Sequence, residues 1–304
     1  MKLVFFGSAS FAVPSLASLA ENVALVVSQP DQPSGRGMLL RPTPVKQKAL
    51  ELGLEVITPV KCRSAETIDL IRGLKADALV VAAYGQILSE PLLNSAARGG
   101  INLHGSILPR WRGAAPIQRA IASGDIYTGV TLMQMDKGMD TGDIIATEPV
   151  SIAPTETAGE LFDRLSYVAA DLAAAWMPAI VSGHYPRTKQ DDAQATMAPK
   201  VTKAEAVLTS DLDCVTAYNR YRAFTPFPGA WIPARLGPLK VLKARQAPGL
   251  VFKAGVVAAV RPDFIIGLAD GALCLETVQP EGRKPMSGAD FANGARLEPG
   301  DRFF

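Results

Sequence analysis

An amide and an imidazole stand two residues apart near the middle of the chain, where an apolar run ends. Asn102 and His104 lie within Ile101–Arg110, a stretch that passes from a predicted strand into a loop. Residues i and i+2 of a strand point to the same side, so we expect both side chains to face one site. An amide donor beside a titratable ring suits a reaction in which a carbonyl oxygen gains charge while a proton moves.

A carboxylate that could complete such a site follows in a glycine-flanked turn. Asp140 lies in Gly138–Asp143, and a turn of this kind can present a side chain without the constraints of a helix. Beside His104, the carboxylate could orient the ring, favour the imidazolium or relay a proton. Asp136 and Asp143 are alternatives, and spacing alone does not choose among the three.

Other common catalytic motifs are missing from the sequence. The turn after the first predicted strand, residues 7–12, holds one glycine, whereas the nicotinamide or flavin fingerprint needs three. The Gly-Arg-Gly at 35–37 is not followed by the Gly-Lys-Ser/Thr of a P-loop. Ser106 has no Gly-x-Ser-x-Gly around it, so we interpret it as a ligand contact or a cap rather than a nucleophile.

The elements that must position these groups alternate along the first part of the chain. Apolar runs predict strands, and segments of 3.6-residue period predict helices. The predicted strands are 2–6, 23–28, 54–58, 78–83, 100–104, 128–135 and 143–150, and the predicted helices are 11–20, 45–52, 65–74 and 157–181. This pattern indicates an α/β fold with a Rossmann-like, mostly parallel, doubly wound sheet, whose ligands bind beyond the carboxyl ends of the strands.

The later part of the chain has a different pattern of predicted elements. We expect a catalytic domain over 1–183, a polar linker over 184–203 and a small OB-like β-barrel domain over 204–304, with short strands separated by Gly and Pro. Within the first domain, residues 29–44 contain four prolines and predict a long irregular loop.

Charge and composition limit the classes of function. The chain of 304 residues has a net charge of +2, yet no acidic residue occurs between Asp213 and Asp263. Such a stretch suits a polyanionic partner, although a solvated basic face remains an equal alternative. Its basic residues are Arg220, Arg222, Arg235, Lys240, Lys243, Arg245, Lys253 and Arg261.

The composition also predicts a location in the cytoplasm, and it disfavours a membrane span, disulfide bonds and a metal site. No run approaches the roughly 18 uncharged apolar residues of a membrane span, so we expect no membrane partner. The three cysteines are far apart and the chain has two histidines, which disfavours disulfides and a metal site. We therefore expect a protein of the reducing cytoplasm.

Taken together, these motifs resemble the folate-dependent formyltransferase superfamily. The likeness is carried by Asn102-x-His104, by the Ser-Ile-Leu-Pro-Arg-Trp-Arg-Gly-Ala-Ala-Pro-Ile of 106–117, and by Asp140 in Met-Asp-Thr-Gly. Further segments resemble the methionyl-tRNA formyltransferases within that superfamily; they are 4–7, 11–16, 29–37, 222–231 and 282–286.

The resemblance implies an enzyme that moves a formyl group from 10-formyltetrahydrofolate to the α-amino group of methionine on initiator tRNA. Asn102, His104 and Asp140 match the catalytic trio, and Arg36 matches a loop arginine that helps read the end of the acceptor stem. The residues that match the folate-contacting segment are Ser106, Ile107, Leu108 and Pro109. The C-terminal residues expected to contact tRNA are Arg220, Arg222, Arg235, Lys240, Lys243 and Arg245.

In this chemistry Asn102 and the His104 N–H would donate to the oxyanion formed as the amine attacks. Asp140 would carry the proton traffic. No metal is needed, because the acyl donor is already activated, and we expect a monomer. The chain departs from the family pattern at Met38-Leu39-Leu40, where relatives often carry lysines. Without those positive charges, attraction to phosphate would be weaker there.

Three other functions compete with this one. A related enzyme could formylate a small amine, such as a nucleotide or an amino sugar, but that would not need Arg36 or the basic second domain. A nucleic-acid-binding protein on an inactive scaffold is disfavoured by the presence of all three polar groups. A nicotinamide dehydrogenase is the most distant alternative.

Overall fold

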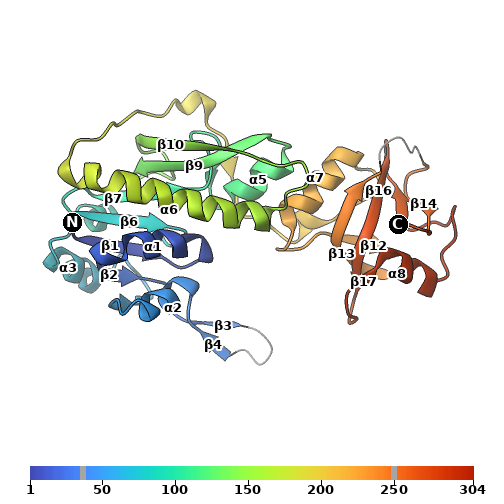
Figure 1. The fold of residues 1–304 in the computed structure, drawn as a ribbon, viewed down its shortest axis with the longest axis horizontal. Helices are drawn as coiled ribbons and strands as arrows, with labels where there is room; N and C mark the ends of the chain where they lie inside the picture. The colour runs from blue at the N-terminus through green and yellow to red at the C-terminus, as the bar shows by residue number, and fades with distance from the viewer. Residues whose placement is uncertain (35–38, 248–251) are drawn as a thin grey trace. The chain divides into compact units, whose positions relative to one another are not determined.

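The computed structural model describes residues 1–34, 39–247 and 252–304 (Figure 1). The chain folds as two compact units, each of which draws on several segments. Unit 1 comprises Met1–Pro116, Thr128–Ser151 and Phe162–Ala198, and unit 2 comprises Ile117–Tyr127, Ile152–Leu161 and Pro199–Phe304.

Unit 1 is built on a seven-stranded sheet. In spatial order its strands are β10 (Ile144–Ser151), β9 (Tyr127–Gln134), β7 (Gly100–His104), β6 (Ala78–Ala82), β1 (Leu3–Gly7), β2 (Val23–Val27) and β5 (Val56–Ile57). The five strands from β7 to β5 run parallel, while β9 is antiparallel to β7. The predicted Rossmann-like, mostly parallel sheet is therefore confirmed.

Alternating side chains of the sheet fill a core on each face. Val4 and Phe6 of β1 belong to one buried cluster together with Ile68 and Ile71, because successive residues of a strand point to opposite faces. The helices that lie wholly or mainly in this unit are α1 (Val13–Leu19), α2 (Pro44–Glu51), α3 (Ala65–Gly73), α4 (Glu90–Leu93) and α6 (Ala158–Ser182). Helix α5 (Pro116–Ala122) belongs to unit 2 from Ile117 onward.

Helix α6 lies beside α1, as Figure 1 shows, with the hydroxyl of Ser18 donating to the Ala170 carbonyl at 3.4 Å. It is long and apolar enough to cross a membrane by length and composition alone. Its buried residues include Leu165, Ala169, Ala173, Met177 and Ile180. That spacing of three and four residues is the apolar stripe of a helix packed on a protein core.

The proline-rich segment 29–44 is more ordered than predicted. Its two halves form an antiparallel hairpin, β3 (Gln32–Ser34) with β4 (Leu39–Arg41), rather than an irregular loop. Of the four prolines, Pro33 lies within a strand. Both strands of a two-stranded ribbon are edge strands, in which a proline is tolerated. The hairpin's tip lies outside the described residues.

The polar segment predicted as a linker is partly built into unit 1. Strand β11 (Met197–Ala198) pairs in parallel with β8 (Arg112–Gly113), and Thr188 bridges to Ile144 of β10. Sequence polarity suggested a solvated spacer, but here the polar groups are satisfied by backbone pairing. The segment up to Ala198 is therefore a structural part of the first unit.

Unit 2 contains a six-stranded antiparallel sheet. The path of pairs runs β12 (Trp231–Ala234), β13 (Gly237–Gln246), β16 (Ala272–Pro280), β15 (Ile265–Gly267) and β14 (Val257–Ala259), with β17 (Met286–Ser287) beside β16. Two helices, α7 (Cys214–Phe224) and α8 (Gly288–Gly294), share one core with these strands. This sheet is the small β-rich domain that the sequence predicted for the later part of the chain.

Candidate active site

Strand β7 places the amide and the imidazole on one side of the sheet. Its residues pair with β6 on one edge and with β9 on the other, where Asn102 lies opposite Met133 and His104 opposite Thr131. His104 is 6% exposed, and Asn102 is half-buried. Because residues two apart in a strand project from the same face, both side chains lie on one face of the sheet, as predicted.

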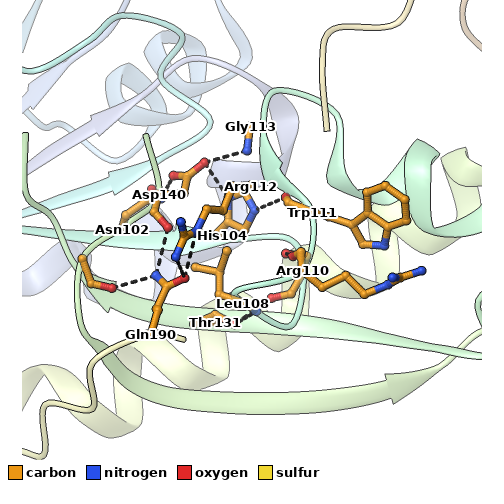
Figure 2. A network of polar contacts seen from close by, with 12 residues as sticks. Asn102, His104, Leu108, Arg110, Trp111, Arg112, Gly113, Thr131, Asp140 and Gln190 are labelled. Carbon is orange, nitrogen blue, oxygen red and sulfur yellow. Dashed lines mark hydrogen bonds and ion pairs between the residues drawn. The ribbon is translucent and has the colours of Figure 1, made fainter. Parts of the chain in front are cut away.

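Asp140 lies where both of these side chains point (Figure 2). The Asn102 amide nitrogen donates to Asp140 Oδ1 at 3.3 Å, and His104 Nδ1 lies 3.5 Å from Asp140 Oδ2. The backbone N–H of Gly113 donates to the same Oδ2 at 2.9 Å. Three groups, one each from Asn102, His104 and Gly113, therefore converge on one carboxylate.

The two alternative carboxylates are occupied elsewhere. Asp136 accepts hydrogen bonds from Gly138 N and from the Thr141 hydroxyl, so it caps the turn itself. Asp143 forms an ion pair with Arg187 at 3.0 Å. Of the three aspartates that sequence spacing left open, Asp140 is the one beside His104.

Both ring nitrogens of His104 are engaged. Nε2 lies 2.9 Å from the carbonyl oxygen of Trp111, and since a carbonyl only accepts, Nε2 carries a hydrogen in this contact. Nδ1 faces the Asp140 carboxylate. Donation from His104 to an oxyanion, as expected from the sequence, would require breaking the Trp111 contact. The second N–H of Asn102 is the donor that needs no such rearrangement.

The backbone around the carboxylate adopts left-handed conformations. Asp140 has φ +53°, Trp111 has φ +63° and Gly113 has φ +123°. Non-glycine residues in this region carry strain that tends to gather at functional sites. A Cβ on Gly113 would also lie 2.8 Å from the Ala198 carbonyl oxygen, so only glycine lets this N–H reach Asp140.

A buried side chain from the predicted linker holds the Asp140 turn in place. The Gln190 amide nitrogen donates to the carbonyls of Asp140 at 2.9 Å and Gly142 at 2.7 Å. Its oxygen accepts from Nε and one terminal nitrogen of the Arg112 guanidinium, at 3.0 and 2.8 Å. The same terminal nitrogen of Arg112 also pairs with Asp192 at 2.8 Å.

Sequence reasoning missed this support. Gln190 lies in a polar run with no local pattern, and only its burial identifies it. The one signal available was Arg112 itself, a charged residue inside the recognised motif that needs a partner when it is buried.

In the segment expected to contact folate, several polar groups form hydrogen bonds to other groups of the protein. The buried Ser106 hydroxyl donates to the Arg110 carbonyl at 2.6 Å, which makes it a cap within the loop. Thr131 donates to the Ser106 carbonyl and accepts from Leu108 N, which ties the loop to β9. Leu108 is buried, while Ile107 and Pro109 are half-buried. Folate contact by these residues stays a prediction.

Arg36, expected to read the tRNA end, lies outside the described residues, as does Met38. Leu39 and Leu40, which stand where relatives often carry lysines, are exposed on β4.

Two of the predicted tRNA-contacting arginines bond to the protein's own backbone. Arg222 is 6% exposed, and one terminal nitrogen donates to the carbonyls of Ala153 and Glu156. Arg220 donates to the Val207 carbonyl at 3.0 Å from a half-buried position. Because its guanidinium is enclosed, Arg222 does not suit the phosphate contact that the sequence predicted, and burial also lowers its pKa.

The acid-free stretch has acidic neighbours in space. Lys243 pairs with Glu276 at 2.9 Å, while Arg245 pairs with Asp263 at 2.5 Å and Glu276 at 3.2 Å. In the pairing of β13 with β16, Lys243 lies opposite Thr277 and Ala244 opposite Leu275, so Glu276 between these two partners comes close to both cations. Among the described residues, the exposed Arg235 and the half-exposed Lys240 are predicted tRNA contacts at the surface for which the structure gives no acidic partner.

Within residues 1–34, 39–247 and 252–304, no group of three or more His, Cys, Asp or Glu side chains is placed to hold a metal ion. Cys62, Cys214 and Cys274 are free thiols, and burial raises the pKa of each. Such protonated thiols are poor nucleophiles and poor metal ligands.

Comparison with known proteins finds family matches over nearly the whole chain. Residues 1–181 match the formyl transferase family, and residues 200–296 match the formyl transferase C-terminal domain. Methionyl-tRNA formyltransferase of Symbiobacterium thermophilum is 44% identical, over 100% of this chain and 95% of that protein. The protein of the same name from a Methylobacterium species is 43% identical, over 99% of both chains.

Solved structures share the fold at lower identity. An N-formyltransferase from Helicobacter canadensis, solved with folinic acid and dTDP-3-aminofucose, covers 90% of this chain and 98% of its own, with a TM-score of 0.68 and 18% identity. HypX from Aquifex aeolicus, solved with tetrahydrofolic acid, covers 100% of this chain and 50% of its own, with a TM-score of 0.65 and 16% identity. The chain therefore belongs to the formyl transferase family, and its full-length likeness is to the methionyl-tRNA formyltransferases within it.

Proposed function

We propose that this protein transfers the formyl group of 10-formyltetrahydrofolate to the α-amino group of methionine on initiator tRNA, for the start of translation. The observation that carries formyl transfer is the convergence of Asn102 and His104 on Asp140. The choice of acceptor is supported by the 43–44% identity over nearly the full length of two methionyl-tRNA formyltransferases.

The geometry suits attack of a neutral amine on a formyl carbon. As the carbon becomes tetrahedral its oxygen gains charge, and the Asn102 N–H that Asp140 does not use is available to stabilise it. Loss of one such donor typically lowers the rate by about 10²–10³. The folate nitrogen leaves as the carbon–nitrogen bond breaks.

The attacking nitrogen must lose a proton and the leaving nitrogen must gain one. Asp140 is positioned as the base, because its Oδ2 is oriented by the Gly113 N–H and faces His104 Nδ1. His104 can hold the transferred proton between its ring and this carboxylate, while the Trp111 carbonyl fixes the ring plane. The proton then returns to the leaving nitrogen, and charge balances over the cycle.

A formylation assay tests this function directly. Labelled 10-formyltetrahydrofolate is incubated with the protein and either methionyl initiator tRNA, free methionine or an amino-sugar nucleotide. We expect label on the charged tRNA. Transfer to a free amine in preference to tRNA would replace the proposed acceptor, and no transfer to any amine would overturn the proposal.

Binding of tRNA should weaken as salt rises, because Lys and Arg contacts displace counterions from phosphate. An affinity that does not change with ionic strength would contradict a tRNA partner. The monomeric state and the cytoplasmic location stay predictions. Light scattering of the purified protein checks the first of these.

A further inference from the structure

Unit 2 carries a groove that no part of the proposed chemistry uses. It has a volume of about 370 Å³, and all of its lining residues belong to unit 2. Pockets for small ligands have volumes of roughly 300–1,000 Å³, so the groove has room for a single small group. The lining that matters here is Lys203, Trp231, Lys240 and Gln279, with Pro228 and Pro238 beside them.

Strand register explains how an aromatic ring, a cation and an amide come to lie side by side. In the antiparallel sheet Trp231 of β12 lies opposite Lys240 of β13, and Lys240 lies opposite Gln279 of β16. Directly opposed residues project from the same face of a sheet. The next pair along, Ile232 and Leu239, is buried in the core, so the row from Trp231 to Gln279 projects outward.

The charges of this row differ from those farther along the same strand. Lys243 is neutralised by Glu276. Lys240 and Lys203 have no ion pair within the described residues, and Glu281 is the acidic member of the lining. The groove thus combines an excess of positive charge with an aromatic side chain and proline surfaces.

We propose that this groove binds one nucleotide of an RNA strand, with the base packed against Trp231 and its phosphate held by Lys240 and Lys203. Aromatic stacking together with lysine is how proteins hold unpaired nucleotides without reading their sequence. The inference rests on the proposed function for its partner, since the strand would be part of the acceptor tRNA. A protein or peptide partner would not require an aromatic residue aligned with unpaired lysines.

Direct binding measurements test the groove. The dissociation constant for uncharged initiator tRNA is measured by fluorescence anisotropy for the wild type, Trp231→Ala, Trp231→Phe and Lys240→Gln. We expect a loss of about tenfold for Trp231→Ala, and a smaller loss for Lys240→Gln with a reduced salt slope. Trp231→Phe keeps a ring and should bind within about threefold of the wild type.

Arg302→Gln is the matched control. It removes one positive charge from an exposed position of unit 2 that does not line the groove. We expect tRNA binding within about twofold of the wild type. Equal losses for Lys240→Gln and Arg302→Gln would overturn the proposal, as would normal binding by Lys240→Gln. Lys240→Gln also decides the matter if Trp231→Ala fails to fold.

Intrinsic fluorescence separates base packing from charge alone. A short single-stranded RNA should quench the wild type more than Trp231→Phe, whereas inorganic phosphate should quench neither. Equal quenching of both proteins by RNA contradicts base packing on Trp231. Formyl transfer by the wild type is assayed in parallel: failure there removes the proposed function, while normal transfer with unaffected binding by the groove variants removes only the groove.

Discussion

The Gln190 side-chain amide donates to the backbone carbonyl of Asp140 at 2.9 Å, although the two residues are fifty positions apart. This contact holds the main chain of a residue whose φ is +53°, and whose carboxylate is shared by Asn102, His104 and Gly113. The arrangement makes Gln190 a positioning residue for the site, with Arg112 fixing its orientation.

Gln190→Ala should lower kcat more than it changes the KM for the folate substrate. The Asp140 turn would lose two hydrogen bonds, and a displacement of about 1 Å can cost on the order of 100-fold in rate. The buried Arg112 would lose an acceptor, which costs about 1–3 kcal/mol of stability. Steady-state kinetics and thermal unfolding measure the two effects.

Gln194→Ala is the control for this variant, because Gln194 is exposed and its side-chain amide donates to Asp191 in its own turn. Gln190→Glu is a second test. It keeps an acceptor for Arg112 but sets carboxylate oxygen against two carbonyls, so activity should stay low. Wild-type kcat in Gln190→Ala would show that Asp140 is held by other contacts.

Asp140→Asn should abolish most turnover, because the amide keeps the shape of the carboxylate but not its capacity to accept a proton. General acid–base groups contribute about 10²–10⁴ in rate. His104→Ala should have an effect of the same kind. In both variants tRNA affinity, measured by anisotropy, should be nearly unchanged. Asp136→Asn alters the carboxylate that caps the same turn, and its turnover should stay near that of the wild type; near-normal turnover by Asp140→Asn would reject the assignment.

Arg222→Ala should reduce stability rather than tRNA affinity. The guanidinium satisfies the carbonyls of Ala153 and Glu156 and the side chain of Asn219. Each buried acceptor left without a donor costs about 1–3 kcal/mol. Differential scanning calorimetry should show a lower Tm, while tRNA binding well below that temperature is retained. Arg235→Ala provides the contrast, because an exposed arginine should affect affinity and leave Tm unchanged; the reverse pattern would contradict this division.

Glu205 should contribute to acid stability. Its hydrogen bond to Arg119 lowers the pKa of the carboxyl from 4.5 to about 2. A carboxyl whose pKa is lower in the folded state stabilises that state above about pH 4.5, and this contribution is lost as pH falls toward 2. The Glu205 side chain is 35% exposed, so solvent screening keeps the effect small.

Urea unfolding at several pH values measures this dependence. Glu205→Gln should be less stable than the wild type near neutral pH, and the difference should shrink between pH 4.5 and 2. Glu298→Gln changes an exposed carboxyl elsewhere in unit 2 and serves as the control. A wild-type and Glu205→Gln pair with parallel pH profiles would exclude a stabilising role for the Arg119 contact.

The local pattern of residues determined the chemistry and the scaffold of this protein. Two-residue spacing put Asn102 and His104 on one side of a strand, since the strand period is two wherever the strand lies. Apolar runs alternating with helical periods likewise predicted the sheet of unit 1, because each element must bury its own apolar face. The glycine-flanked turn limited the candidates for the carboxylate beside His104 to three aspartates.

Only the tertiary structure decided which distant groups meet. It selected Asp140 over Asp136 and Asp143, recruited Gln190 from a segment predicted to be a linker, and enclosed Arg222. It also set Glu276 against Lys243 and Arg245, so a stretch without acids in sequence is partly neutralised in space. Sequence periodicity reports the face on which a side chain lies, whereas the partner opposite that face depends on strand pairing and chain packing over long separations.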